Sequence, residues 1–282
     1  MTAARVCGIG DEAAASLTGQ IAVHRDLGLT GLEVRTVGGK GLHELTEAEF
    51  AAAAAELDAS GLAVPAVDTP IGSWAVTVGS DFAAECRILA TAAARSLALG
   101  CDRLRVMSYP GDGRDEADWR REALRRVREL TVRAADSGVT LLHENCQGWG
   151  GRSARHTLEL LEAAPGLRLV FDIGNGLAYG YEATAFLAAV IDHVDHVHVK
   201  DGETVGGEAV FGPPGDGEVD LHGCLDLLDR AGYDGWLSLE PHVAHIPHLR
   251  ASGAPEDLER GYRACALAFL DLLAERKEGG RG

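Results

Sequence analysis

The sequence has little positive charge. It contains 26 Lys and Arg against 43 Asp and Glu, which gives a formal net charge of -17. Such a chain repels nucleic-acid phosphates and anionic lipid surfaces, because affinity for both depends on Lys and Arg. We therefore expect neither a nucleic acid nor a membrane as partner. A negative field instead suits the capture of a metal cation or a neutral polyol.

The sequence also lacks long apolar runs and paired cysteines. No run approaches the ~20 apolar residues that a bilayer-spanning helix needs. Residues 1–5 do not lead into the apolar segment that is typical of a signal peptide. The six cysteines are scattered without a Cys-x-x-Cys pair. This pattern is typical of reduced thiols, so we expect a cytoplasmic protein.

Strand-like runs alternate with amphipathic helical runs along the whole chain. We expect strands at 5–9, 31–35, 62–67, 103–107, 139–144, 167–172, 194–201 and 235–240, each followed by a helix. Such alternation requires a parallel sheet, and eight units predict a closed (β/α)8 TIM barrel. We expect one barrel domain over residues 1–282, with 276–282 as a frayed tail. An open doubly wound sheet is the alternative, but Gly8-x-Gly10 is too short for its phosphate-binding loop.

The run 194–201 shows the clearest strand pattern. Val197 and Val199 point to one face, and His196, His198 and Lys200 to the other. Two imidazoles and an ammonium inside a covered sheet are costly to bury without partners. They are better explained as the wall of a polar site than as solvated side chains.

Polar residues also end other predicted strands. In a barrel, the carboxyl ends of the strands meet at one rim, where functional side chains gather. Glu144, Asp172, His198 and Glu240 each follow an apolar run. Three carboxylates and an imidazole at one point would repel unless a cation lay between them. Their oxygen-rich donor set suits Mn²⁺, Mg²⁺ or Co²⁺, with Zn²⁺ also possible.

Several blocks along the chain resemble the sugar phosphate isomerase/epimerase family, the xylose-isomerase-like TIM barrels. The resemblance covers essentially the whole chain and rests on the blocks 31–33, 144–145, 171–175, 196–201, 215–220 and 232–240. It implies one divalent metal held by Glu144, Asp172, His198 and Glu240. It also implies that Glu144 and Glu240 act as the acid/base pair of an isomerase or epimerase, working on a sugar or related ketone through an enediolate.

The chain departs from the family pattern near the substrate. Ketose epimerases commonly carry a His three residues after the metal Asp, where this chain has Asn175, and an Arg soon after the metal His, where Lys200 is the nearby cation. With few cations at the rim, we expect an unphosphorylated sugar, keto-sugar or cyclitol. We expect Asn175, Lys200, Trp74, Arg35 and His242 to contact it.

Three other functions fit parts of the sequence. A dehydratase or lyase acting on a keto-sugar or inosose would use the same site. A non-catalytic sugar-binding subunit would share the pocket without turnover, and an endonuclease-IV-like repair enzyme shares the barrel but needs a basic groove. The sequence does not decide between epimerisation, isomerisation and elimination, nor whether the chain forms a homo-oligomer.

Overall fold

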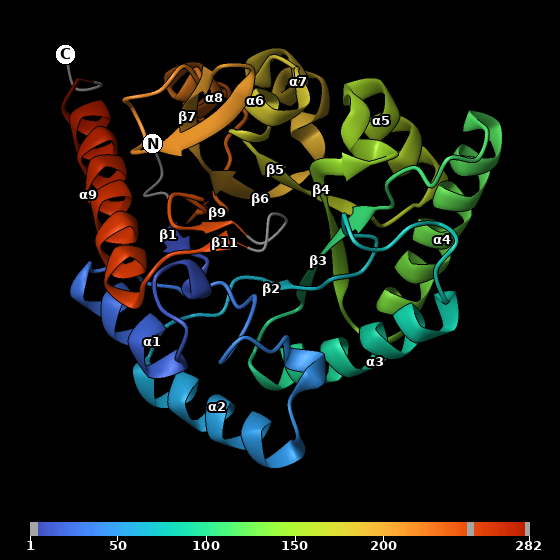
Figure 1. Ribbon diagram of the computed structural model, residues 1–282, viewed down its shortest axis with the longest axis horizontal. Helices are drawn as coiled ribbons and strands as arrows, with labels where there is room; N and C mark the ends of the chain where they lie inside the picture. The colour runs from blue at the N-terminus through green and yellow to red at the C-terminus, as the bar shows by residue number, and fades with distance from the viewer. Residues whose placement is uncertain (1–4, 247–250, 280–282) are drawn as a thin grey trace.

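The computed structural model describes residues 5–246 and 251–279. Its central sheet has seven parallel strands in the order β1-β9-β6-β5-β4-β3-β2. These are β1 (Arg5–Gly8), β2 (Val67–Asp68), β3 (Arg103–Ser108), β4 (Thr140–Gly148), β5 (Arg168–Asp172), β6 (Val194–Val199) and β9 (Trp236–Leu239). The strands lie at the centre and the helices surround them (Figure 1).

Residues 31–34 occupy the eighth position of the ring. Isolated parallel bridges join Glu33 to Ile9 on one side and Val34 to Val67 on the other. Because this segment connects the two ends of the seven-stranded sheet, the sheet closes on itself. The predicted (β/α)8 barrel is confirmed, although the predicted strands at 31–35 and 62–67 are reduced to single bridges and to the two residues of β2.

Most of the larger helices begin after a residue whose side chain accepts from the first free backbone N–H groups. A capping box is present at Thr46, with the Thr46 hydroxyl accepting from Glu49 N and the Glu49 carboxylate accepting from Thr46 N. The larger helices are α1 (Leu17–Asp26), α2 (Glu47–Ser60), α3 (Phe82–Ala98), α4 (Glu116–Asp136), α5 (Ala154–Ala163), α7 (Ala183–Val190), α8 (Leu221–Arg230) and α9 (Pro255–Gly279). Shorter helical segments are α6 (Asn175–Tyr179) and the 3-10 turns Gly10–Glu12, Leu42–Glu44, Gly150–Arg152 and Ile191–His193.

The structure differs from expectation in α9 and in the segment after β6. Helix α9 continues to Gly279, so residues 276–279 are helical rather than part of a frayed tail; 280–282 lie outside the described residues. A hairpin of β7 (Asp201–Val205) and β8 (Glu208–Gly212) follows β6 and was not predicted. A second small pair is β10 (His245–Ile246) with β11 (Ala251–Ser252).

Apolar helix faces pack against the outside of the barrel. On α4, Ala123, Val127, Leu130 and Ala134 are buried and Trp119 is half-buried. None of the helices in the described residues is both long and apolar enough to cross a membrane. The six cysteines are all free thiols.

Candidate metal centre

Four side chains from separate strands meet at the carboxyl end of the barrel. Glu144 lies on β4, Asp172 ends β5, His198 lies on β6 and Glu240 follows β9. Strand register aligns them, since Asp172 pairs with His198. Each offers one ligand atom, and these atoms all lie within 4.8 Å of one another. All four residues are at most 4% exposed.

The donor atoms at this centre are set by neighbouring hydrogen bonds. Asp172 Oδ1 accepts from the backbone N–H groups of Gly174 (2.8 Å) and Asn175 (2.9 Å), which leaves Oδ2 for the centre. His198 Nδ1 lies 3.3 Å from Glu240 Oε2. Asp172 Oδ2, His198 Nδ1 and Glu240 Oε2 are all buried atoms. Two oxygens and an imidazole nitrogen are a donor set that suits a divalent cation.

Three cations of the chain lie among the carboxylates. Lys200 Nζ lies 2.9 Å from both Asp172 Oδ2 and Glu240 Oε2 as an ion pair. Arg35 lies 3.0 Å from Glu240, and Arg105 Nε lies 3.4 Å from Glu144. Burial alone would lower the pKa of Lys200, but Asp172 and Glu240 outweigh it and raise that pKa. Lys200 is therefore a lasting positive charge at the centre.

Glu240 and His198 shift each other's pKa. Burial raises the pKa of Glu240, but Lys200, His242 and His198 outweigh it, so its pKa lies well below the ordinary value. Burial lowers the pKa of His198, whereas Glu33 and Glu240 raise it to well above the ordinary value. The neighbouring positive charges thus hold the Glu240 side chain in its ionised form.

A cavity of about 600 Å³ opens above the centre. Glu144 and Glu240 line it, whereas Asp172 and His198 lie beneath its surface. The five predicted substrate contacts all line it: Arg35, Trp74, Asn175, Lys200 and His242. Residues 207–211 of the β7–β8 hairpin form part of the wall, with the Phe211 ring 5.4 Å from Lys200 Nζ. Whether these residues bind a substrate stays a prediction.

Some of these side chains have partners of their own in the structure. Asn175 Nδ2 donates to Glu144 Oε1 (3.1 Å), and Lys200 Nζ donates to Asn175 Oδ1 (3.4 Å). His242 has a positive φ of 51°, which is unusual for a residue with a side chain. Its backbone N–H donates to Glu12 Oε2 at 2.8 Å, and this contact fixes the turn.

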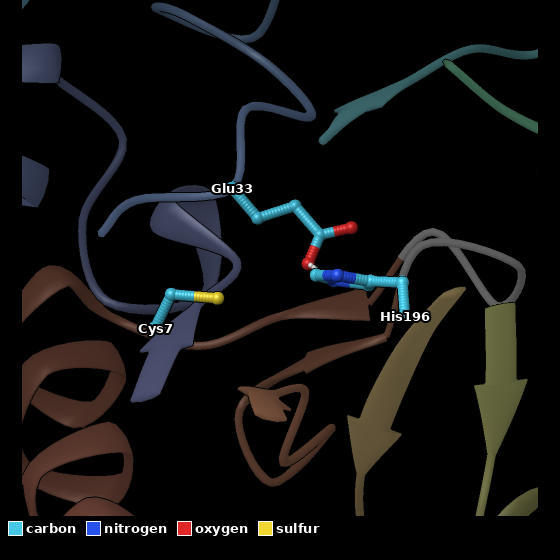
Figure 2. Close-up of side chains that lie close together, drawn as sticks. All are labelled: Cys7, Glu33 and His196. Carbon is cyan, nitrogen blue, oxygen red and sulfur yellow. Dashed lines mark hydrogen bonds and ion pairs between the residues drawn. The ribbon is translucent and has the colours of Figure 1, made fainter. Parts of the chain in front are cut away.

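Glu33 lies below the centre, inside the barrel. Its carboxylate accepts from His196 Nε2 (2.8 Å) and His198 Nε2 (3.0 Å) and from the Ser238 hydroxyl. Figure 2 shows the Glu33 carboxylate directed at His196, with the Cys7 thiol on the other side of the group. Burial and the nearby Glu33 raise the pKa of Cys7 well above its ordinary value, so the thiol stays neutral.

Sequence reasoning placed Arg35 at the site but missed Asp11, Glu12, Asp68 and Arg105. Arg105 joins Asp68 (2.8 Å) to Glu144, and Arg35 joins Asp11 and Glu12 to Glu240. Arg105 carried a signal, because it alternates with Leu104 and Val106 and so must face the barrel interior. Asp11 and Glu12 also follow a predicted strand, the first one.

Comparisons with known proteins agree with this architecture. The chain is 28% identical over 179 residues to the rhizopine catabolism protein MocC of Rhizobium meliloti, covering 54% of each chain. It is 28% identical over 143 residues to an inosose dehydratase of Geobacillus thermodenitrificans, covering 45% of this chain and 47% of the relative. The chain thus spans about half the length of the curated relatives it matches.

A solved L-ribulose 3-epimerase superposes with a TM-score of 0.75 at 19% identity, over 98% of this chain and 97% of the other. At that identity the likeness concerns the fold. The family model described as xylose isomerase-like TIM barrel matches residues 21–264. The chain therefore belongs to the xylose isomerase-like TIM barrel family.

Proposed function

We propose that this chain is a divalent-metal-dependent isomerase or epimerase that acts on a sugar, keto-sugar or cyclitol. One observation carries the proposal: four buried side chains, Glu144, Asp172, His198 and Glu240, each bring one ligand atom to within 4.8 Å of the others. The oxygen-rich donors favour Mn²⁺, Mg²⁺ or Co²⁺ over metals that prefer thiolates.

The two glutamates are the groups that move a proton. A bound metal would polarise the substrate carbonyl and so make the neighbouring C–H bond more acidic. Glu144 and Glu240 come from β4 and β9, which are separated in the ring by β5 and β6. They therefore approach a bound substrate from different directions. One carboxylate removes the proton, and the other returns it to the opposite face or to the neighbouring carbon.

The charges of the cavity favour a neutral substrate. The Lys and Arg residues that line it are Arg35, Arg105 and Lys200. Each already lies within 3.4 Å of a carboxylate of the chain. A phosphate group would have to compete with these carboxylates for a cation. Hydroxyl groups suit the same wall better, because they both donate and accept hydrogen bonds.

Dehydration is the second candidate. It begins with the same proton removal, after which a hydroxyl group leaves from the adjacent carbon. The curated relative from Geobacillus is named an inosose dehydratase and matches 45% of this chain. In addition, Lys200 and Asn175 stand where ketose epimerases commonly carry Arg and His, so the groups around the substrate differ from those of an epimerase.

Incubation of the metal-loaded protein with a panel of ketoses and inososes in D₂O tests both candidates. Deuterium that enters a carbon position without loss of water supports the isomerase or epimerase. Loss of water supports the dehydratase. Glu144→Gln and Glu240→Gln should each lower kcat by ~10²–10⁴-fold. Glu203→Gln, on the exposed part of β7, is the matched control and should leave kcat unchanged.

Two results would contradict the proposal. One is metal-loaded protein that exchanges no proton of any compound in the panel. The other is turnover that survives both glutamine substitutions, because the carboxylates would then take no part in proton transfer.

A further inference from the structure

A single carboxylate inside the barrel joins two histidines of one strand. Glu33 is fully buried on the segment between β1 and β2, and neither it nor His196 lines the cavity. Its Oε1 accepts from His198 Nε2 and its Oε2 from His196 Nε2. Figure 2 shows the Glu33 side chain reaching across the barrel interior to the His196 ring. Of the four candidate metal ligands, His198 is therefore the one that Glu33 contacts in the described residues.

The contact with Glu33 determines which nitrogen of His198 faces the centre. An imidazole that donates Nε2–H to a carboxylate presents Nδ1 as its remaining nitrogen. In this ring orientation Nδ1 lies 3.3 Å from Glu240 Oε2. A ring turned over to place Nε2 at the centre would lose the hydrogen bond to Glu33 and leave a buried carboxylate oxygen without that donor.

Glu33 is itself held from a second side. The Ser238 hydroxyl donates to Oε2, the same oxygen that accepts from His196. Oε1 is therefore the oxygen directed at His198. The Glu33 carboxylate has its plane fixed by three donors, and it can fix the His198 ring in turn.

We propose that Glu33 is a positioning residue of the metal centre, which holds His198 in the form that binds a divalent cation through Nδ1. This inference shares the metal centre with the proposed function, but it does not depend on the reaction that the protein catalyses. Carboxylates that accept from a metal-binding histidine fix its tautomer and orientation and increase its basicity. A residue with a purely structural role would instead change stability without a selective effect on metal binding.

Titration of the full-length protein with Mn²⁺, followed by electron paramagnetic resonance of the free ion, measures this effect without substrate. Glu33→Gln should weaken Mn²⁺ binding by ~10–100-fold, because loss of a carboxylate that hydrogen-bonds a metal-binding histidine typically lowers metal affinity by this factor. Glu203→Gln is the matched control: it makes the same substitution at an exposed position of β7, away from the Glu33 carboxylate. Its Kd for Mn²⁺ should stay within about threefold of the unsubstituted protein.

A second measurement needs no substitution. In Zn²⁺-loaded protein with ¹⁵N-labelled histidine, the NMR spectrum of His198 should show a protected Nε2–H and a metal-bound Nδ1. A metal-bound Nε2 would overturn the proposal even if Glu33→Gln fails to fold. Glu33→Gln that binds Mn²⁺ as tightly as Glu203→Gln would also overturn it, as would an unsubstituted chain that binds no divalent cation.

The two proposals fail in different ways. If the protein binds Mn²⁺ through His198 but converts no sugar or cyclitol, the role of Glu33 stands and the proposed activity falls. If turnover needs Glu144 and Glu240 while Glu33→Gln leaves metal affinity unchanged, the reverse holds.

Discussion

Asp201 should be among the residues on which stability depends most. It follows Lys200 directly and is only 1% exposed. Its carboxylate accepts hydrogen bonds from four backbone N–H groups, those of Gly202 (2.7 Å), Gly215 (2.8 Å), Gly217 (3.2 Å) and Val219 (3.2 Å). These contacts tie the start of the β7–β8 hairpin to the loop that leads into α8, and the hairpin forms one wall of the cavity.

The cost of Asp201→Asn follows from the number of acceptors. Asparagine keeps one side-chain oxygen and replaces the other with an NH₂ group, which cannot accept from a backbone N–H. At least two of the four N–H groups then lose their acceptor. With ~1–3 kcal/mol for each buried donor left without a partner, the substitution should lower the free energy of unfolding by about 2–6 kcal/mol.

Urea denaturation of both proteins at pH 7.5 gives this difference. Asp195→Asn is the matched control, because Asp195 forms a partly exposed ion pair with Arg168 at 2.8 Å. Such pairs contribute about 0–1 kcal/mol. The reasoning is refuted if Asp201→Asn costs no more than Asp195→Asn, because the four backbone contacts would then contribute nothing measurable.

Three other properties can be measured with the same protein. Mn²⁺ at about 100 times its Kd should stabilise the fold by ~2.7 kcal/mol and raise Tm, and EDTA should reverse this; an unchanged Tm would argue against the metal centre. Glu85→Gln, which breaks a buried ion pair with Arg126 at 3.0 Å, should cost about 3–5 kcal/mol in urea unfolding, and a loss below about 1 kcal/mol would contradict it. Burial raises the pKa of Cys224 and of Cys265 to about 12, so at pH 8 only ~1 in 10,000 of each thiol is ionised. Thiol reagents should therefore modify these two cysteines slowly, with a rate that rises about tenfold for each unit of pH. Rapid modification of the folded protein would contradict this.

The strand pattern of residues 194–201 correctly predicted which side chains face the barrel interior. The alternation of valines with His196, His198 and Lys200 indicated that the three polar side chains share one face, and all three are buried inside the barrel. This prediction succeeds because period-two alternation is a property of the backbone, and it needs no knowledge of the neighbouring strands.

The long cations were harder to place from sequence. Arg105 and Arg35 each reach carboxylates that lie on other strands, such as Glu144 and Glu240. Which carboxylate a flexible arginine reaches depends on the register between strands and on the space above them, and neither is encoded locally. The β7–β8 hairpin was missed for a related reason, because Asp201 holds it through contacts with residues more than ten positions away.

The pairing of β1 with β9 has a consequence for synthesis of the chain. Arg5 pairs with Trp236, so one edge of the first strand stays open until the ribosome has added roughly 230 further residues, which takes on the order of 10 to 50 seconds. During that interval the unfinished sheet exposes unsatisfied backbone groups on β1 and, once it has been made, on β6, where another chain could attach. The nascent protein should therefore depend on chaperones until β9 emerges, whereas the finished ring has no open edge.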